Sequence, residues 1–316
     1  MALASEALSH PSMVENSGQQ FYWANVMGSS YRWQDYTCTY EVHNLDANGI
    51  PLLLIHPIGV GLSRHFWQPF VEQWQGRTLY VPDLLGCGDS DLPRRPYSPR
   101  DWAEQLHHFV VEVIRKPVIV VVQGALLPVA LELMADKTMT QWVVGAALSG
   151  PPAWRLITEP TPEWRQQLNW SLFASPLGWG FYQYARTQKF LKSFSERQLF
   201  DQATDVTEDW LSMLNQGSRE MATRYAVFSF LAGFWRQDYG GAIASIQQPI
   251  LVIMGKTAST IDRTAQDTTA EQRLEDYTSH FPNASGVSIP GRNVLPYESP
   301  SEFIQVLQPF VNTLPS

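Results

Sequence analysis

The chain has 316 residues, of which 44% are hydrophobic and 16% are charged, and its formal net charge is −8. This length suits one large core with an inserted subdomain better than two independent domains. The charged fraction lies below the roughly 25% of an average globular protein, so we expect an apolar surface. Nucleic acid is excluded as an expected partner, because no segment clusters the Lys and Arg that phosphate neutralisation needs.

Residues 1–20 have neither the basic nor the apolar region of a secretory signal. We expect residues 1–30 to form a flexible N-terminal tail. The most apolar run, residues 118–135, is interrupted by Gln123, Gly124 and Pro128. This pattern favours a buried strand that turns into a helix over a membrane span.

The two cysteines, Cys38 and Cys87, lie in different segments and belong to no zinc-binding spacing. We interpret both as reduced thiols of a cytoplasmic protein, and we expect neither a metal nor a cofactor. Cys87 could serve as a nucleophile, but no histidine is assigned beside it, and a small packing side chain is the favoured interpretation.

In chain order, residues 31–43 alternate aromatic or β-branched with polar side chains, which predicts antiparallel edge strands. Short apolar runs then predict strands buried on both faces. These runs span residues 52–55, 78–81, 118–122, 142–148 and 250–254.

Helices are predicted between these strands. Ser98-Pro-Arg-Asp101 gives an N-cap, a proline in the first turn and an acidic residue at the capping-box position, so a helix should run from Ser98 to about Arg115. A second helix is expected over residues 126–135, and a last one begins at Ser299. Alternating strands and helices predict an α/β fold with a doubly wound, mostly parallel sheet.

The alternation stops over residues 151–245, which are rich in aromatic side chains and contain no apolar strand pattern. We predict a helical lid here, inserted between core segments 31–150 and 246–316. Its aromatics could form an ordinary core, line an apolar cavity, or make an exposed patch that docks on a membrane or a protein partner.

Two motifs carry a resemblance to a known family. Residues 51–61 read Pro-Leu-Leu-Leu-Ile-His-Pro-Ile-Gly-Val-Gly, and residues 83–90 read Asp-Leu-Leu-Gly-Cys-Gly-Asp-Ser. The chain resembles the α/β-hydrolase family over roughly residues 45–150 and 246–314. The pattern is also similar to uncharacterised hydrolase-like proteins of cyanobacteria and plastids. The resemblance implies a Ser-acid-His triad at the ends of three strands.

None of the triad residues is found where the resemblance implies it. Gly124 stands at the nucleophile position, Ala258 at the acid position and Val294 at the histidine position. Val122 and Leu126 replace the small residues that flank the nucleophile in this family. The sequence therefore predicts a hydrolase fold with a degenerate triad.

Three residues remain as candidates for other chemistry. His56 could act as a general base, Ser149 is the nearest hydroxyl from another strand, and Asp262 lies four residues after the acid position. The predicted pocket and oxyanion loop comprise His56, Pro57, Ile58, Gly59, Gln123, Gly124 and Ala125.

Two functions follow from these residues. The first is a non-hydrolytic binding, scaffold or assembly protein for an apolar or lipid-like ligand, or for a protein or membrane partner at the lid. The alternative is a hydrolase of an apolar ester in which His56 activates water and backbone N–H groups near Ile58 and Ala125 bind the oxyanion. A peripheral position on a membrane is compatible with the first function.

Overall fold

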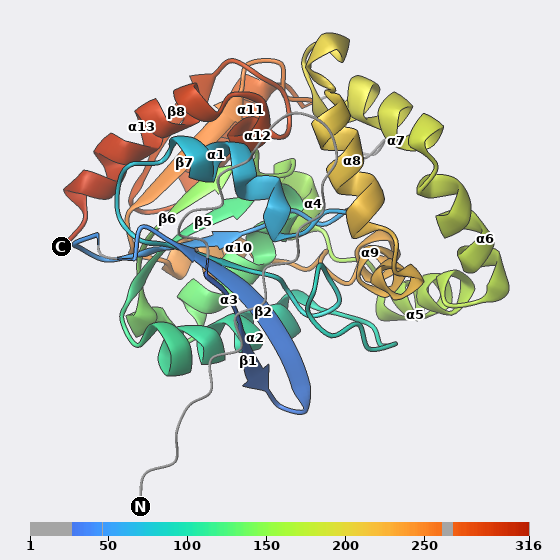
Figure 1. The fold of residues 1–316 in the computed structure, drawn as a ribbon. Helices are drawn as coiled ribbons and strands as arrows, with labels where there is room; N and C mark the ends of the chain where they lie inside the picture. The colour runs from blue at the N-terminus through green and yellow to red at the C-terminus, as the bar shows by residue number, and fades with distance from the viewer. Residues whose placement is uncertain (1–26, 46, 261–267, 316) are drawn as a thin grey trace, which may run out of the picture.

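The computed structural model describes residues 27–45, 47–260 and 268–315 (Figure 1). Most of the predicted tail, residues 1–30, lies outside them, as does the candidate Asp262. The first strand begins at Met27, four residues before the strand pattern that the sequence suggests at Tyr31.

One eight-stranded sheet forms the centre of the molecule, in the order β1-β2-β4-β3-β5-β6-β7-β8. β1 and β2 form an antiparallel hairpin, β2 is antiparallel to β4, and all other neighbours are parallel. The fold class that the sequence predicts is thereby confirmed. The strands are β1 Met27–Trp33, β2 Tyr36–His43, β3 Leu52–Ile55, β4 Leu79–Pro82, β5 Val118–Gln123, β6 Val143–Ser149, β7 Ile250–Gly255 and β8 Ala284–Ile289.

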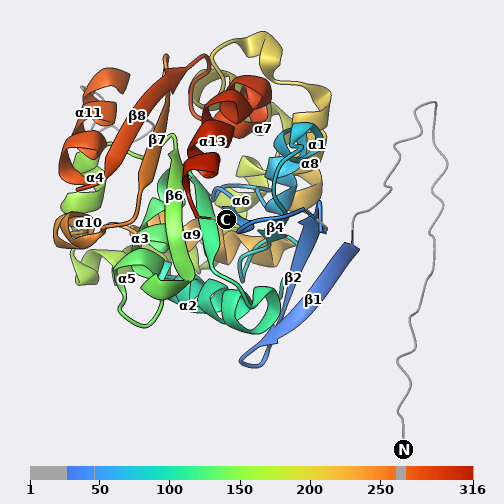
Figure 2. The same cartoon turned by 90° about the vertical axis from the view of Figure 1, so that its left-hand side faces the viewer.

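Helices cover both faces of the sheet, which explains the continuous apolar runs of the central strands. Val118, Val120 and Val122 of β5 face one core cluster, whereas Ile119 and Val121 face the other. The first face is covered by α2 Pro99–Phe109, α3 Leu127–Ala135, α10 Gly240–Ser245 and α11 Ala270–His280, and the second by α1 Gln68–Gln73 and α13 Pro300–Thr313. In the turned view, α10 and α11 lie on one side of the strands and α1 and α13 on the other (Figure 2).

Helix α2 begins as its sequence predicts. The Ser98 hydroxyl accepts from the Asp101 backbone N–H, and the Asp101 carboxylate accepts from the Ser98 backbone N–H, which completes a capping box. The helix continues as a π-helix over Val110–Ile114 and ends at Arg115, whose φ of 56° is left-handed. The end point agrees with the prediction, and the widened last turn could not be expected from the periodicity.

All elements between β6 and β7 are helical. They include α4 Trp154–Thr158, α5 Glu163–Phe173, α6 Pro176–Ala185, α7 Gln188–Phe194, α8 Glu208–Gly217 and α9 Arg224–Ala232. Figure 1 shows α5 to α9 gathered beyond one end of the sheet, with α5 and α6 at the outer edge of the molecule. We call α5 to α9 the lid. In the described parts of the chain, no helix is long and apolar enough to cross a membrane.

Candidate functional site

The carboxyl ends of β5, β7 and β8 meet at the same edge of the sheet, because these strands run parallel. Gly124 follows β5 directly and opens a short 3-10 helix, Gly124–Leu126, that leads into α3. Its φ is +64°, a backbone conformation that glycine adopts without steric cost. A Cβ placed on Gly124 would meet no atom within 4 Å, so there is open space above this turn.

The loop after β7 places Ala258 in an apolar environment. Its side chain is 8% exposed and packs with Met254 and Ala270. A methyl group can neither accept nor donate a hydrogen bond, so this position cannot orient an imidazole ring. The other acidic candidate for this loop, Asp262, lies outside the described residues.

The loop after β8 contains two neighbours that point in different directions. Val294 is 3% exposed and packs with the apolar cluster that includes Leu295 and Phe303. The Asn293 side chain donates through Nδ2 to the Ser259 carbonyl at 2.9 Å, in the loop after β7, and to the Gln198 carbonyl at 2.7 Å. Asn293, and not Val294, therefore faces the loop where the family carries its acid.

A hydrogen-bond network joins the three strand ends to the lid. Gln123, which precedes Gly124, donates through Nε2 to the Asn293 carbonyl at 2.7 Å. The Asn293 backbone N–H in turn donates to the Leu199 carbonyl at 3.0 Å. The network uses the immediate neighbours of Gly124, Ala258 and Val294, and it holds the lid segment 198–199 against them.

Two buried oxygens near this network lack a partner among the described residues. They are Gln123 Oε1 and Ser149 Oγ, whose residues lie opposite each other on β5 and β6. Ser149 is fully buried, and no residue that could act as its base donates or accepts a hydrogen bond to the hydroxyl. A serine without such a base is a poor nucleophile, so the geometry gives Ser149 no support as a catalytic residue.

A half-buried carboxylate, that of Glu298, binds the neighbouring lid residue Asp201 to the loop after β8. Glu298 accepts from the Asp201 N–H at 2.5 Å and from the Arg292 N–H at 2.7 Å. Burial raises the pKa of Glu298 above its usual value, and the two backbone donors oppose this shift. The Arg292 guanidinium also donates to the Arg197 carbonyl at 3.0 Å.

His56 is fully buried, and both of its ring nitrogens are engaged. Nε2 accepts from the Leu84 N–H at 3.1 Å, so Nδ1 carries the proton and donates to the Pro57 carbonyl at 2.8 Å. Burial lowers the pKa of His56 below its ordinary value. Both ring nitrogens thus already have a partner, and this geometry gives no support to the hypothesis that His56 activates water.

The loop after β3 is pressed against the lid. Gly61 has a φ of +76°, and a Cβ there would lie 2.0 Å from the Leu214 carbonyl oxygen of α8. A Cβ on Gly217, at the end of α8, would lie 2.2 Å from the Gly61 carbonyl oxygen. The two glycines thus let the backbone of the loop after β3 contact the backbone of α8. Ile58 and Ala125, which belong to the predicted oxyanion loop, are partly buried against the main core cluster.

The Asp83–Ser90 motif builds a loop and does not supply reacting groups. The fully buried Asp83 carboxylate accepts from the Arg64 N–H at 2.8 Å, from the Arg64 guanidinium and from the Thr39 hydroxyl at 3.1 Å. A Cβ on Gly88 would lie 2.2 Å from Asp83 Cγ, which explains why glycine is needed there. Cys87 is 3% exposed, and burial raises its pKa, so its thiolate is disfavoured.

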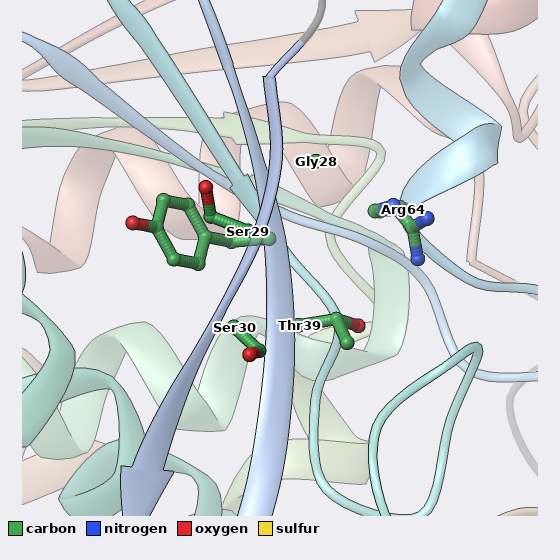
Figure 3. Close-up of a pocket in the computed structure, with 6 residues that line it drawn as sticks. Gly28, Ser29, Ser30, Thr39 and Arg64 are labelled. Carbon is green, nitrogen blue, oxygen red and sulfur yellow. The ribbon is translucent and has the colours of Figure 1, made fainter. Parts of the chain in front are cut away.

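A surface cavity of about 330 Å³ lies at the β1–β2 edge (Figure 3), apart from the three strand ends. Its wall includes Arg64, but the guanidinium of Arg64 is already paired with Glu41, Asp83 and Asp89. It is lined by Gly28, Ser29, Ser30, Thr39, Tyr40 and Arg64. A cation that is already neutralised offers little to an anionic ligand. Among the described residues, no three His, Cys, Asp or Glu side chains gather as metal ligands.

The strand order, the loop after β3, the sharp turn after β5 and the helical insertion after β6 define an α/β-hydrolase fold. Residues 52–306 match the sequence model of the alpha/beta hydrolase family, and the chain belongs to this family. No curated protein matches the chain.

Solved structures support the fold. A thermophilic esterase from Thermogutta terrifontis is 16% identical, with a TM-score of 0.68 and coverage of 92% of this chain and 99% of that one. The protein ALR0039 from Nostoc sp. PCC 7120 is 18% identical, with a TM-score of 0.71 and coverage of 91% and 98%. An enol-lactonase from Burkholderia xenovorans LB400 is 12% identical, with a TM-score of 0.68 and coverage of 90% and 100%. At these identities the likeness concerns the fold alone.

Proposed function

We propose that this chain is a non-hydrolytic member of the α/β-hydrolase family, with a degenerate triad and a binding or scaffold role. One observation carries the proposal: the ends of β5, β7 and β8 present Gly124, Ala258 and the pair Asn293–Val294. None of these side chains can act as nucleophile, acid or base. We assign the vacated histidine position to Asn293 in place of Val294, because its amide faces the loop after β7.

The alternative function, an ester hydrolase built around His56, has less support. Taking a proton at Nε2 would break the bond from the Leu84 N–H, and it would place a positive charge in a fully buried position. The Gln123 side chain, next to the vacated nucleophile position, is also engaged by the Asn293 carbonyl.

The test is an assay of the purified protein on short-chain and long-chain p-nitrophenyl esters, combined with labelling by a fluorophosphonate probe. We expect hydrolysis no faster than in buffer, and no covalent labelling. The same rates are expected for Ser149→Ala and His56→Gln. Turnover that co-purifies with the protein and disappears in either variant would overturn the proposal.

We propose further that this protein is cytoplasmic and binds through its lid, by which it associates peripherally with a membrane or a protein complex. The network from Gln123 through Asn293 to Leu199 supports this, because it makes the lid a fixed platform. A rigid binding surface loses less conformational entropy when a partner binds.

A second candidate function is the binding of a small apolar or lipid-like ligand, favoured by the open space above Gly124. A dansylated fatty acid serves as the probe, and its saturable fluorescence should weaken in Gly124→Leu. Leu45→Ser, exposed on the loop after β2 and far from the lid in sequence, is the matched control and should leave this signal unchanged. Equal binding by all three proteins would contradict the candidate.

A further inference from the structure

Most exposed large hydrophobic side chains of the described chain gather on two neighbouring helices of the lid. Of the nine such residues, seven lie on α5 or α6, and the other two are Leu45 and Leu231. The seven, which we call the outer face, are Trp164, Leu168, Leu172, Leu177, Trp179, Phe181 and Tyr184. Single exposed hydrophobics are ordinary, whereas a contiguous set marks an interaction surface.

The spacing of these residues makes stripes on the helices. Trp164, Leu168 and Leu172 are four residues apart, so they share one side of α5. Leu177 and Phe181 make the corresponding stripe on α6, which Tyr184 extends at spacing three. Both stripes face solvent, and Figure 1 places the two helices at the outer edge of the molecule.

Other residues of the same helices hold them in place from beneath. Phe173 of α5 stacks on Phe228 of α9, with ring centroids 5.0 Å apart. Tyr182 of α6 is fully buried and shares a hydrogen bond of 2.8 Å with the Thr223 hydroxyl. Trp170 packs inward against Tyr225. Both helices therefore bury another side. Within the outer face, the rings of Phe181 and Tyr184 also contact lid residues, whereas no ring contact is formed by Trp164 or Trp179 in the described chain.

The sequence across the outer face is free of formal charge. Residues 166–185, which span the end of α5 and all of α6, contain no Asp, Glu, Lys or Arg. Helix α6 is apolar around most of its circumference, a pattern typical of helices that are covered on all sides. An apolar helix that is exposed to water at the edge of an otherwise acidic protein is stabilised when a binding partner buries its apolar surface.

Basic residues surround this uncharged segment. Residues 163–192 carry four basic side chains and one acid, Glu163, which gives +3 against −8 for the whole chain. Arg165, Lys189 and Lys192 are exposed, and none of the ion pairs in the described ranges involves them. Arg94 adds a further charge, since its guanidinium donates to the Ala174 carbonyl between α5 and α6 at 3.3 Å.

We propose that the outer face binds the surface of an anionic phospholipid bilayer, with α5 and α6 lying at the headgroup level. This inference rests on the proposed non-hydrolytic binding role of the lid. Apolar stripes with tryptophan on α5 and α6, followed by the lysines of α7, fit helices that lie in a membrane interface, with tryptophan at the edge of the acyl region and lysine near the headgroups. We call the exposed Arg165, Lys189 and Lys192 the basic rim. A second copy of the chain fits less well, because pairing two outer faces would bring the basic rims of the two copies toward each other.

The first experiment is co-sedimentation with vesicles of phosphatidylcholine mixed with phosphatidylglycerol, and with vesicles of phosphatidylcholine alone. The wild-type chain should bind the mixed vesicles and bind more weakly as salt is raised. The triple variant Trp164→Ser, Leu168→Ser, Leu177→Ser should lose roughly a hundredfold in partitioning, because three side chains no longer enter the apolar layer. Leu45→Ser, exposed to 59% on the loop after β2, is the matched control and should bind as wild type.

Charge variants separate the basic rim from the apolar face. Lys189→Gln with Lys192→Gln should weaken binding to the mixed vesicles about thirtyfold, at about 1 kcal/mol for each lysine near an anionic surface. The matched control is Lys116→Gln with Lys137→Gln, two exposed lysines beyond the amino ends of the strands. This control should bind as wild type, and thermal unfolding should show that all variants are folded.

Three outcomes would overturn the inference: no sedimentation with phosphatidylglycerol vesicles, equal sedimentation of the triple variant and the wild type, or equal weakening by both lysine pairs. Light scattering that reveals a dimer lost in the triple variant, without vesicle binding, would assign the face to a second copy instead. The ester assay on the same preparations distinguishes the two proposals. Hydrolysis would overturn the proposed non-hydrolytic function, and it would leave the vesicle-binding result unaffected.

Discussion

Gly124 occupies the turn after β5 with a φ of +64° and open space where a side chain would project. Because a Cβ at this position would meet no neighbouring atom, Gly124→Ala should fold. Its loss of stability should come only from the left-handed backbone conformation. We expect a loss of about 1–2 kcal/mol in the free energy of unfolding, the cost of left-handed backbone for an L-residue. Urea denaturation of the two proteins measures it.

The control for Gly124→Ala is Gly61→Ala, which combines a φ of +76° with a Cβ that would lie 2.0 Å from the Leu214 carbonyl oxygen. It should lose clearly more stability, because the backbone of α8 must move as well. Equal losses in the two variants would mean that the space above Gly124 is filled in solution.

His56 should make the stability of the protein depend on pH. Its folded-state pKa is lowered from 6.5 chiefly by burial, and the nearby Asp83 carboxylate opposes this shift. The unfolded chain therefore binds more protons as the pH falls below 6.5. The contribution of His56 is fully present above that pH and is lost as the pH decreases toward the folded-state pKa.

The measurement is urea denaturation of the wild type and His56→Gln between neutral and mildly acidic pH. The variant should be less stable at neutral pH, since glutamine cannot reproduce both bonds of the ring, and the difference should shrink as the pH falls. His107, whose pKa is also lowered by burial, contributes equally to both proteins and cancels. A difference that stays constant with pH would contradict the neutral, doubly bonded ring.

At the scale of elements, α8 depends on glycine where it meets the loop after β3. Gly217→Ala should cost about 1–3 kcal/mol, the usual penalty for overpacking, because its Cβ would lie 2.2 Å from the Gly61 carbonyl oxygen. Hydrogen exchange should also become faster in α8. The matched control is Gly241→Ala in α10, where a Cβ meets no atom within 4 Å and better helix propensity should leave stability unchanged or slightly higher.

The elements most readily predicted from the sequence are those whose signal is local. The capping box of Ser98 and Asp101 starts α2 as expected, and the apolar run of β5 marks a strand covered on both faces. β8 gives no such signal, because it is an edge strand with mostly exposed or half-buried residues. The π-helical end of α2 depends on packing and is equally invisible in the periodicity.

The candidate site shows the same division. The positions of Gly124 and Ala258 follow from motifs that lie directly after strands, and the structure places both there. The choice between Asn293 and Val294 needs the direction of each side chain, which neither spacing nor composition contains. Composition also could not reveal which lid aromatics point outward, because Trp164 and Trp170 occupy the same helix and face opposite environments.

At the scale of the whole molecule, charge and polarity are distributed unevenly. The core carries most of the acidic residues, whereas residues 163–192 are net basic and interrupted by an uncharged segment. The sheet gathers the ends of β5, β7 and β8 under this lid, and the network around Asn293 fixes the lid to them. The ends of these three strands thus lie assembled beneath the lid, and the exposed apolar side chains lie on α5 and α6.

If only the reacting groups are missing, returning them together should restore some chemistry. We expect the variant Gly124→Ser, Ala258→Asp, Asn293→His to hydrolyse p-nitrophenyl acetate faster than Gly124→Ser alone, because triad members act as a unit and a lone serine lacks its base. Replacing Asn293→His by Val294→His in the triple variant is the matched control. It should stay inactive and lose stability, since Val294 is 3% exposed and packs in the core. Activity in the control but not in the first variant would reverse the assignment of the histidine position to Asn293.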